Sequence, residues 1–310
     1  MSEGAMQAIG RRLAADEVIL LDGATGTELE RRGAPMHDEV WCGAATLSHG
    51  ALLRDIHEDY IRAGASVVIA NTYGSNRIML EPAGLGSEFE SINRRAVEIA
   101  LEARDRAAGG DAIAVAGSMS HMVPMRHDPA RAPSPARANE CFTEMAQTLA
   151  DAGVDLIILE MMSNPELARP AVAAALATGL PVWIGYSARR GGRGEPVPFL
   201  RPDLDFADMV RAVHSDEVRI HGVMHTNVDL TGPAIDVLRG LFGGPILVYP
   251  DSGFFAMPNW QFVNIVSPQE LARAARGWIE EHGARLVGGC CGLGVEHIEA
   301  LAEMIAARRP

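Results

Sequence analysis

Short apolar runs recur along this chain, and several of them follow a helical stretch that ends at a glycine. Ala63-Gly64, Ala152-Gly153, Thr178-Gly179 and His282-Gly283 are four such junctions. Glycine readily adopts the left-handed conformation that ends a helix. Strands that are apolar throughout are typical of a parallel sheet covered by helices on both faces. The pattern therefore predicts a chain of repeated β-α units.

The number of these units narrows the fold. About eight β-α units are expected, which is the number that closes a (β/α)8 TIM barrel. A doubly wound open sheet is the main alternative. We find no break in composition that marks a second domain, so residues 1–310 are expected to form one α/β barrel domain. The expected strands are 18–22, 67–71, 113–117, 156–160, 182–186, 218–224, 246–249 and 286–289.

Capping residues predict where several helices begin. Ser91 and Asn139 each precede a stretch with helical periodicity, and Asn164-Pro165 pairs a cap with a proline at the first helical position. Ser267-Pro268 has the same form. Helices are therefore expected after each of these residues.

Composition excludes several classes of protein. The 40 acidic residues outnumber the 27 basic ones, and we see no basic tract, so nucleic acid is not an expected partner. Neither a signal peptide nor an apolar run long enough to cross a bilayer is evident. Four cysteines in 310 residues indicate a reducing compartment. We expect a soluble, cytoplasmic monomer or homodimer that acts on small molecules, with no membrane partner.

Polar residues stand where the apolar strands end. In a TIM barrel these positions form one rim, and the rim carries the chemistry. A single carboxylate at such a position is as often a helix cap, but a whole set of polar endings favours a functional site. The set is Asp22, Asn71, Ser118, Glu160, Ser187, His225, Tyr249 and Cys290.

The last strand leads into Gly288-Gly289-Cys290-Cys291-Gly292. Adjacent cysteines rarely form a disulfide with each other, whereas two neighbouring thiolates are a good ligand pair for zinc. The alternative is that both cysteines are simply small buried hydrophobic residues. The motif favours a metal site.

Five motifs follow one another along essentially the whole chain. They are Asp22-Gly23-Ala24-Thr25-Gly26-Thr27-Glu28-Leu29, Asn71-Thr72-Tyr73, Glu160, Tyr249-Pro250-Asp251-Ser252-Gly253 and the paired cysteines. Together, and in this order, they resemble the homocysteine S-methyltransferase family, whose members are zinc-bearing TIM barrels that methylate homocysteine to methionine.

The resemblance also implies roles for individual residues. Asp22 and Glu160 would hold the ammonium group of homocysteine, and the backbone N–H groups of Gly23 and Ala24 would bind its carboxylate. Tyr73 would line the pocket near the metal. Thr27 and Asn71 complete the expected substrate-binding set.

One position departs from the family pattern. The family's third zinc ligand is a cysteine after the sixth strand, and His225 stands there in this chain. Cys42 and Cys141 lie in other contexts and are expected to pack in the core. A site with one histidine and two cysteines, here His225, Cys290 and Cys291, still leaves zinc an open position. The alternative is that His225 only hydrogen-bonds at the strand end and the zinc site is lost.

The sequence says less about the identity of the methyl donor than about that of the methyl acceptor. A chain of this length resembles the members that use a sulfonium donor such as S-methylmethionine, since the extra domains of cobalamin-dependent members are missing. Phe254, Phe255, Trp260 and Phe262 follow the seventh strand and could face a cationic donor, although a packed loop is the more common explanation for such a cluster. Two other functions stay open: a relative with an altered or absent zinc site that acts on a different thiol or selenol, and a non-catalytic module that works with a separate corrinoid protein.

Overall fold

The chain folds as a barrel of eight parallel strands, as the sequence predicts. The computed structural model describes residues 4–122, 133–256 and 258–308. The strand order is β1-β12-β9-β8-β5-β4-β3-β2, and a parallel bridge between Leu21 and Val67 joins the two ends of the sheet. The strands are β1 (Ile19–Leu20), β2 (Val67–Ile69), β3 (Ala114–Ser120), β4 (Leu156–Met162), β5 (Val182–Tyr186), β8 (Ile220–Asn227), β9 (Ile246–Asp251) and β12 (Ala284–Val287).

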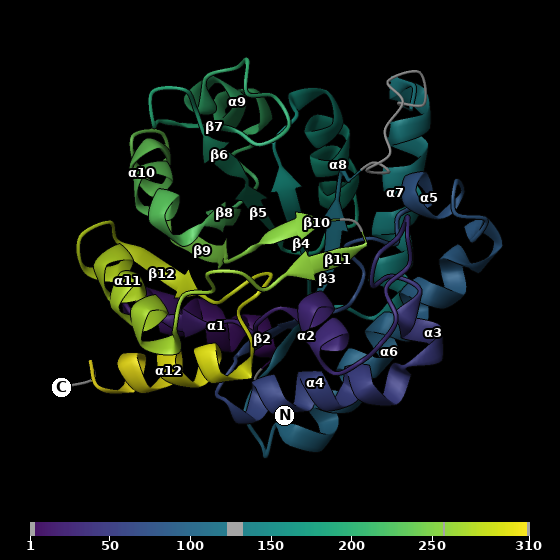
Figure 1. Ribbon diagram of the computed structural model, residues 1–310, viewed down its shortest axis with the longest axis horizontal. Helices are drawn as coiled ribbons and strands as arrows, with labels where there is room; N and C mark the ends of the chain where they lie inside the picture. Colours follow the sequence, from purple (N-terminus) through teal and green to yellow (C-terminus); the bar gives the residue numbers. More distant parts are fainter. Residues whose placement is uncertain (1–3, 123–132, 257, 309–310) are drawn as a thin grey trace.

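A helix follows each of these strands and packs on the outside of the barrel (Figure 1). The apolar strands are therefore covered on both faces, which is why they lack the alternating pattern of a half-exposed sheet. The doubly wound alternative is excluded, because the first and last strands meet. The eight helices are α4 (Gly50–Arg62), α6 (Phe89–Ala107), α7 (Pro135–Ala152), α8 (Pro165–Ala177), α9 (Phe206–Val213), α10 (Val228–Arg239), α11 (Pro268–Glu280) and α12 (Val295–Ala306).

Two of the four expected caps are confirmed and two are wrong. Asn164 and Ser267 cap α8 and α11 through their side chains. Ser91 instead lies inside α6, and its hydroxyl donates to the Glu88 carbonyl. Asn139 lies inside α7, which begins after Ser134, whose hydroxyl accepts from the backbone of the first turn. Serine followed by proline is the same signal that marks α11, so the start of α7 was readable from the sequence.

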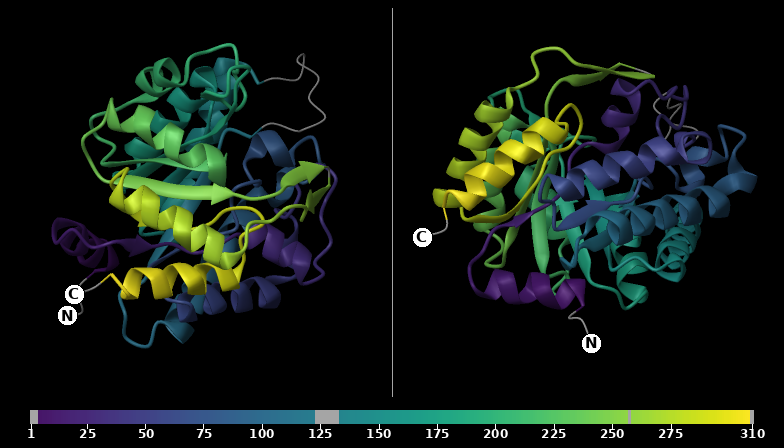
Figure 2. Two further views of the ribbon diagram at one scale, coloured as in Figure 1. Left: turned by 60° about the vertical axis from the view of Figure 1, so that its left-hand side comes forward. Right: turned by 90° about the horizontal axis from the view of Figure 1, so that it is seen from below.

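Shorter elements close the two ends of the barrel. The helix α1 (Ala5–Ala14) lies at one end, and the hairpin of β10 (Phe254–Ala256) and β11 (Asn259–Gln261) lies at the other, where the strands end (Figure 2). A second hairpin joins β6 and β7. The remaining short elements are α2 (Thr25–Arg31), α3 (Ala45–Ser48), α5 (Arg77–Leu80), a 3-10 turn η1 (Gly86–Glu88), β6 (Ala188–Arg190) and β7 (Pro196–Pro198).

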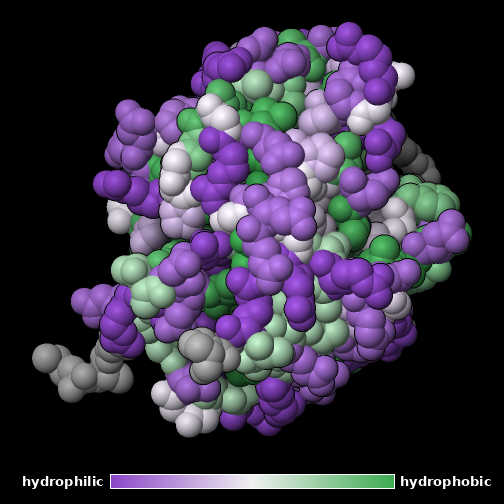
Figure 3. All heavy atoms as spheres, turned by 90° about the vertical axis from the view of Figure 1, so that its left-hand side faces the viewer, coloured by the Kyte–Doolittle hydropathy of each residue, from purple (hydrophilic) through white to green (hydrophobic). Residues whose placement is uncertain are grey.

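The outer surface carries charged and polar side chains between scattered apolar ones, as the face in Figure 3 shows. Among the described residues, none of the helices combines the length and the apolar character that crossing a membrane requires. All four cysteines are free thiols, which agrees with the absence of a disulfide framework expected from the sequence.

Candidate metal centre

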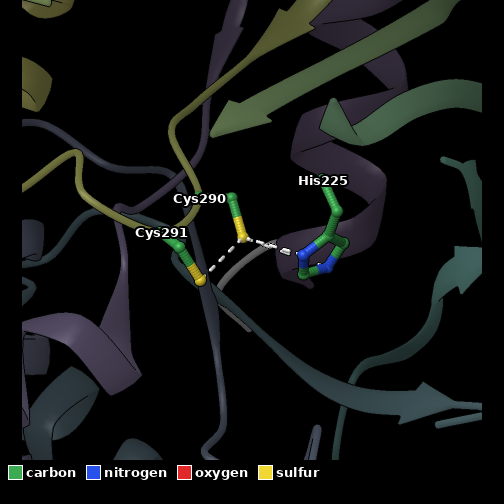
Figure 4. A group of neighbouring side chains, drawn as sticks. All are labelled: His225, Cys290 and Cys291. Atoms are coloured by element: carbon green, nitrogen blue, oxygen red, sulfur yellow. Dashed lines mark hydrogen bonds between the residues drawn. The ribbon is translucent and has the colours of Figure 1, made fainter. Parts of the chain in front are cut away.

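Three side chains from two neighbouring parts of the rim point toward one another. His225 lies near the end of β8, and Cys290 and Cys291 follow β12 (Figure 4). The Cys290 sulfur lies 3.3 Å from His225 Nδ1 and 3.8 Å from the Cys291 sulfur. The ligand atoms of the three residues all lie within 4.8 Å of one another. The structure thus brings together the three residues that the sequence predicted as metal ligands.

The backbone is bent sharply where these ligands are presented. Gly292 has φ +83°, and a Cβ there would lie 2.0 Å from the Ser252 carbonyl oxygen, so only glycine fits. The Gly292 N–H donates to the hydroxyl of Thr27, which fixes the turn that holds the cysteines. His225 itself has φ +46°, a conformation rare for residues with a side chain. Strain of this kind concentrates at functional sites.

The spacing suits a tetrahedral metal such as zinc. With Zn–S bonds of about 2.3 Å, two ligands of a regular tetrahedron lie about 3.8 Å apart, and a sulfur and a nitrogen lie about 3.5 Å apart. The corresponding distances here are 3.8 Å between the sulfurs and 3.3 Å between the Cys290 sulfur and His225 Nδ1. Within the described parts of the chain, no further histidine, cysteine or carboxylate joins these three residues as a fourth potential ligand. Two of the three spacings therefore match tetrahedral zinc, the third pair, His225 and Cys291, lies within 4.8 Å, and a fourth position would be left for another ligand.

A carboxylate holds the histidine from its other side. His225 Nε2 lies 2.8 Å from Glu160 Oε2, and both side chains are nearly buried, 10% and 5% exposed. An imidazole that donates from Nε2 presents the lone pair of Nδ1, here the nitrogen that faces Cys290. The ring of Tyr73 stacks on the imidazole at 5.0 Å between centroids. Metal-binding histidines commonly donate their second N–H to a carboxylate in this way.

The pKa values of the ionisable groups at the centre depend strongly on one another. Burial raises the pKa of the Cys290 thiol far above its usual range, with the neighbouring Cys291 acting in the same direction and His225 opposing it. Burial alone would lower the pKa of His225, but Cys290 and Glu160 outweigh it and raise that pKa. A cysteine that binds a metal must lose its proton, and a buried thiolate charge is unfavourable by itself. A bound cation would compensate that charge and so favour the thiolate form.

Asp22 is buried in the barrel and does not reach the cavities at the candidate metal centre. The carboxylate is fully buried and accepts from the Tyr249 hydroxyl at 3.0 Å and from the Ile69 N–H at 2.7 Å. Burial raises the pKa of Asp22 well above its ordinary value, although both hydrogen bonds lower it. Asp22 does not line either cavity at the centre, whereas its partner Tyr249 does.

The other residues expected to bind substrate fall into two groups. Ala24, Asn71, Tyr73 and Glu160 line a small cavity together with the three residues of the candidate metal centre. The Ala24 N–H, expected to bind a carboxylate, already donates to the Leu293 carbonyl at 3.1 Å. Gly23 and Thr27 lie outside the lining of both cavities.

Hydrogen bonds fix several of these polar side chains. The amide of Asn71 is held by Thr46 and by Cys42, whose thiol donates to it. Among the other polar strand ends, the Ser187 hydroxyl donates to the Met224 carbonyl at 2.7 Å. The Ser118 hydroxyl is buried and has no hydrogen-bond partner among the described residues.

A larger, mostly apolar cavity of about 360 Å³ is lined by His225 and Cys291, two of the three residues of the candidate metal centre. The hairpin β10–β11 supplies Phe254, Phe255 and Trp260 to its wall. Phe262, which the sequence grouped with them, instead lies under the guanidinium of Arg31, 4.8 Å from its ring centre. Three of the four aromatic residues thus face a cavity, and one packs elsewhere.

Sequence reasoning missed several contributors to these cavities, among them Trp41, Cys42 and Asp251. Trp41, which has φ +50°, lines both cavities. Cys42, expected only to pack, lines the small one, and burial raises the pKa of its thiol to about 12. Asp251 lines the larger cavity and lies within the Tyr-Pro-Asp-Ser-Gly motif, which was its signal in the sequence.

Comparisons with known proteins agree with this geometry. The sequence profile of a family described as homocysteine S-methyltransferase matches residues 19–305. A selenocysteine methyltransferase of Astragalus bisulcatus is 28% identical over 94% of this chain and 94% of its own length. A homocysteine S-methyltransferase of Escherichia coli is 28% identical, over 89% of this chain and 91% of that protein. The crystal structure of the Escherichia coli homocysteine methyltransferase MmuM in its oxidized form is similar with a TM-score of 0.77 and 26% identity, covering 96% of this chain and 99% of that one.

Proposed function

The chain belongs to the homocysteine S-methyltransferase family, and from that premise we propose that it is a zinc-dependent enzyme of methionine biosynthesis. It would transfer a methyl group from a small sulfonium or ammonium donor, S-methylmethionine in preference, to the sulfur of homocysteine. The observation that carries this proposal is the convergence of His225, Cys290 and Cys291 at the rim of the barrel, with their ligand atoms all within 4.8 Å of one another.

The chemistry that zinc supplies at such a site is to hold the substrate sulfur and to favour its thiolate at neutral pH. The protein's own part is to keep three ligands in place. Cys290 and Cys291 are fixed by the turn at Gly292, and His225 is oriented by Glu160 and Tyr73. Because one histidine replaces a thiolate, the metal carries less electron density than in a site with three cysteines.

The two cavities suggest how the substrates are divided. Homocysteine would occupy the small cavity, where Glu160 offers its carboxylate to the amino-acid part and Asn71, held by Thr46 and Cys42, forms part of the wall. Asp22 would act through Tyr249, to which it is hydrogen-bonded. The donor would enter from the larger cavity, which shares His225 and Cys291 with the small one. Holding both substrates against the metal ligands would supply much of the rate acceleration.

Transfer of an isotopically labelled methyl group tests the proposal. Purified protein loaded with zinc would be given homocysteine and labelled S-methylmethionine, then trimethylsulfonium and glycine betaine as further donors. We expect labelled methionine from a sulfonium donor, loss of activity on chelation, and recovery when zinc is added. Absence of transfer from every donor would contradict the proposal and favour the non-catalytic alternative.

Selenocysteine is a second candidate acceptor, because a relative that matches nearly the whole chain is named a selenocysteine methyltransferase. Competition between homocysteine and selenocysteine in the same assay ranks the two acceptors. We further propose a cytoplasmic location, since four free thiols suit a reducing compartment.

A further inference from the structure

A single carboxylate faces the larger cavity. Asp251 is the last residue of β9, and it pairs with Asn227 of β8. Its Oδ1 atom is shielded from solvent and has no hydrogen-bond partner among the described residues. Buried carboxylate oxygens are normally paired, because an unpaired one costs a substantial part of its hydration energy. Asp251 therefore lacks a partner that a ligand could supply.

The position of this carboxylate relative to the metal centre is fixed by the backbone. The Cys290 N–H donates to the Pro250 carbonyl at 2.6 Å, and the Ser252 N–H donates to the Cys291 carbonyl at 2.9 Å. The residues on both sides of Asp251 are thus tied to the two cysteines. A group held by Asp251 would lie in the cavity that His225 and Cys291 also line.

The rest of the cavity suits a cation. Trp41, Tyr73, Phe255 and Trp260 present aromatic rings, and aromatic faces attract positive charge. Among the described residues that line this cavity, Asp251 is the one carboxylate, and there is no arginine. An uncharged ligand would gain from the aromatic rings but would leave the carboxylate unpaired.

We propose that Asp251 binds the cationic head of the methyl donor and thereby selects onium donors over uncharged ones. This inference rests on the proposed function and adds the residue that recognises the positive charge of the methyl donor. Methyl transfer breaks the bond from the methyl carbon to the onium sulfur or nitrogen, and the electron pair of that bond stays on the leaving atom. A new bond forms between the homocysteine thiolate and the methyl carbon, so the donor loses its positive charge as the thiolate loses its negative charge.

This change of charge predicts which kinetic constant depends on Asp251. The carboxylate interacts with the full charge of the bound donor but only with the remaining charge of the transition state. Removing it should therefore weaken donor binding more than it slows the chemical step. We expect Asp251→Asn to raise the donor KM about tenfold or more, with kcat unchanged or higher. The homocysteine KM and the zinc content should not change.

Binding of an inert pair of probes tests the charge recognition without turnover. Choline and 3,3-dimethylbutan-1-ol have nearly the same shape, but only choline carries a positive charge. Calorimetry on the zinc-loaded protein should show tighter binding of choline, and Asp251→Asn should reduce the ratio of the two affinities about tenfold. Asp229→Asn is the matched control, since Asp229 is 70% exposed, pairs with Arg190 and lies outside the cavity lining.

The outcomes separate this inference from the proposed function. Active wild type with an unchanged affinity ratio and donor KM in Asp251→Asn would overturn the inference alone. A wild type that transfers no methyl group, yet prefers choline through Asp251, would overturn the proposed function and leave the cation site standing. Loss of zinc or of kcat in Asp251→Asn would show that the residue supports the metal instead, which also overturns the inference.

Discussion

Replacing Glu160 by glutamine should weaken zinc binding about tenfold, because the hydrogen bond to His225 would lose its charge. The bond is short, 2.8 Å, and both side chains are nearly buried, so solvent screens it little. Glutamine can still accept from Nε2 through its amide oxygen. We therefore expect a loss of zinc affinity near the lower end of the roughly 10- to 100-fold range that is typical when a residue hydrogen-bonded to a metal ligand is replaced. A tenfold loss corresponds to about 1.4 kcal/mol of binding free energy.

Competition with a chromophoric chelator measures the zinc affinity, and cobalt in place of zinc reports the ligand geometry through its visible spectrum. Glu58→Gln is the matched control. Glu58 is of similar burial, 7% exposed, but it lies on α4 and pairs with Arg62 and Arg106. The control should bind zinc as the wild type does.

The same variant distinguishes two roles for Glu160. If the carboxylate orients His225, zinc affinity and the cobalt spectrum should change in the absence of homocysteine. If it only binds the ammonium group of homocysteine, zinc affinity should equal that of the wild type while homocysteine affinity falls. Equal zinc affinity in wild type and Glu160→Gln would refute the orienting role.

Three further changes test other parts of the account. Cys290→Ser or Cys291→Ser should abolish zinc binding and activity while the circular dichroism spectrum of the barrel persists, and retained zinc would contradict the ligand assignment. Burial raises the pKa of Asp22 above 3.8, so the folded protein binds that proton more tightly than the unfolded chain and loses stability as pH rises above about 4. Asp22→Asn should flatten the curve of unfolding free energy against pH, measured by urea denaturation, and an identical slope would argue against it. Gly292→Ala should destabilise the protein by at least about 2 kcal/mol more than Gly179→Ala, because both residues have positive φ but only Gly292 would also place a Cβ against a carbonyl oxygen. Equal melting temperatures in the two variants would contradict that difference.

The sequence predicted the barrel and the meeting of His225 with the paired cysteines, because both follow from local pattern and topology. His225 lies near the carboxyl end of β8 and Cys290 follows the carboxyl end of β12, and the carboxyl ends of parallel strands meet on the same rim of a barrel. The helix cap at Asn164 was readable because its partner lies two residues away. The start of α6 shows the limit of this reasoning, because no side chain caps that helix, whereas the start of α7 at Ser134 carried the same serine-proline signal as α11 and was overlooked.

Contacts between distant residues were not readable in the same way. Glu160 and His225 are 65 residues apart, and their hydrogen bond depends on the directions that two strand ends give to their side chains. Asp22 illustrates the converse, because the sequence placed it at the site but could not show that Tyr249 and Ile69 occupy its two oxygens. The free oxygen of Asp251 appears only when its neighbours are known.

The most direct test of the metal centre is the zinc content of protein purified under reducing conditions, measured for wild type and for His225→Ala. The account predicts nearly one zinc per chain in the wild type and a large loss in the variant, because His225 would supply one of the three ligands that we propose. Equal zinc in the two proteins would show that another residue completes the site. A wild type that holds no zinc, even after the metal is added back, would contradict the central claim.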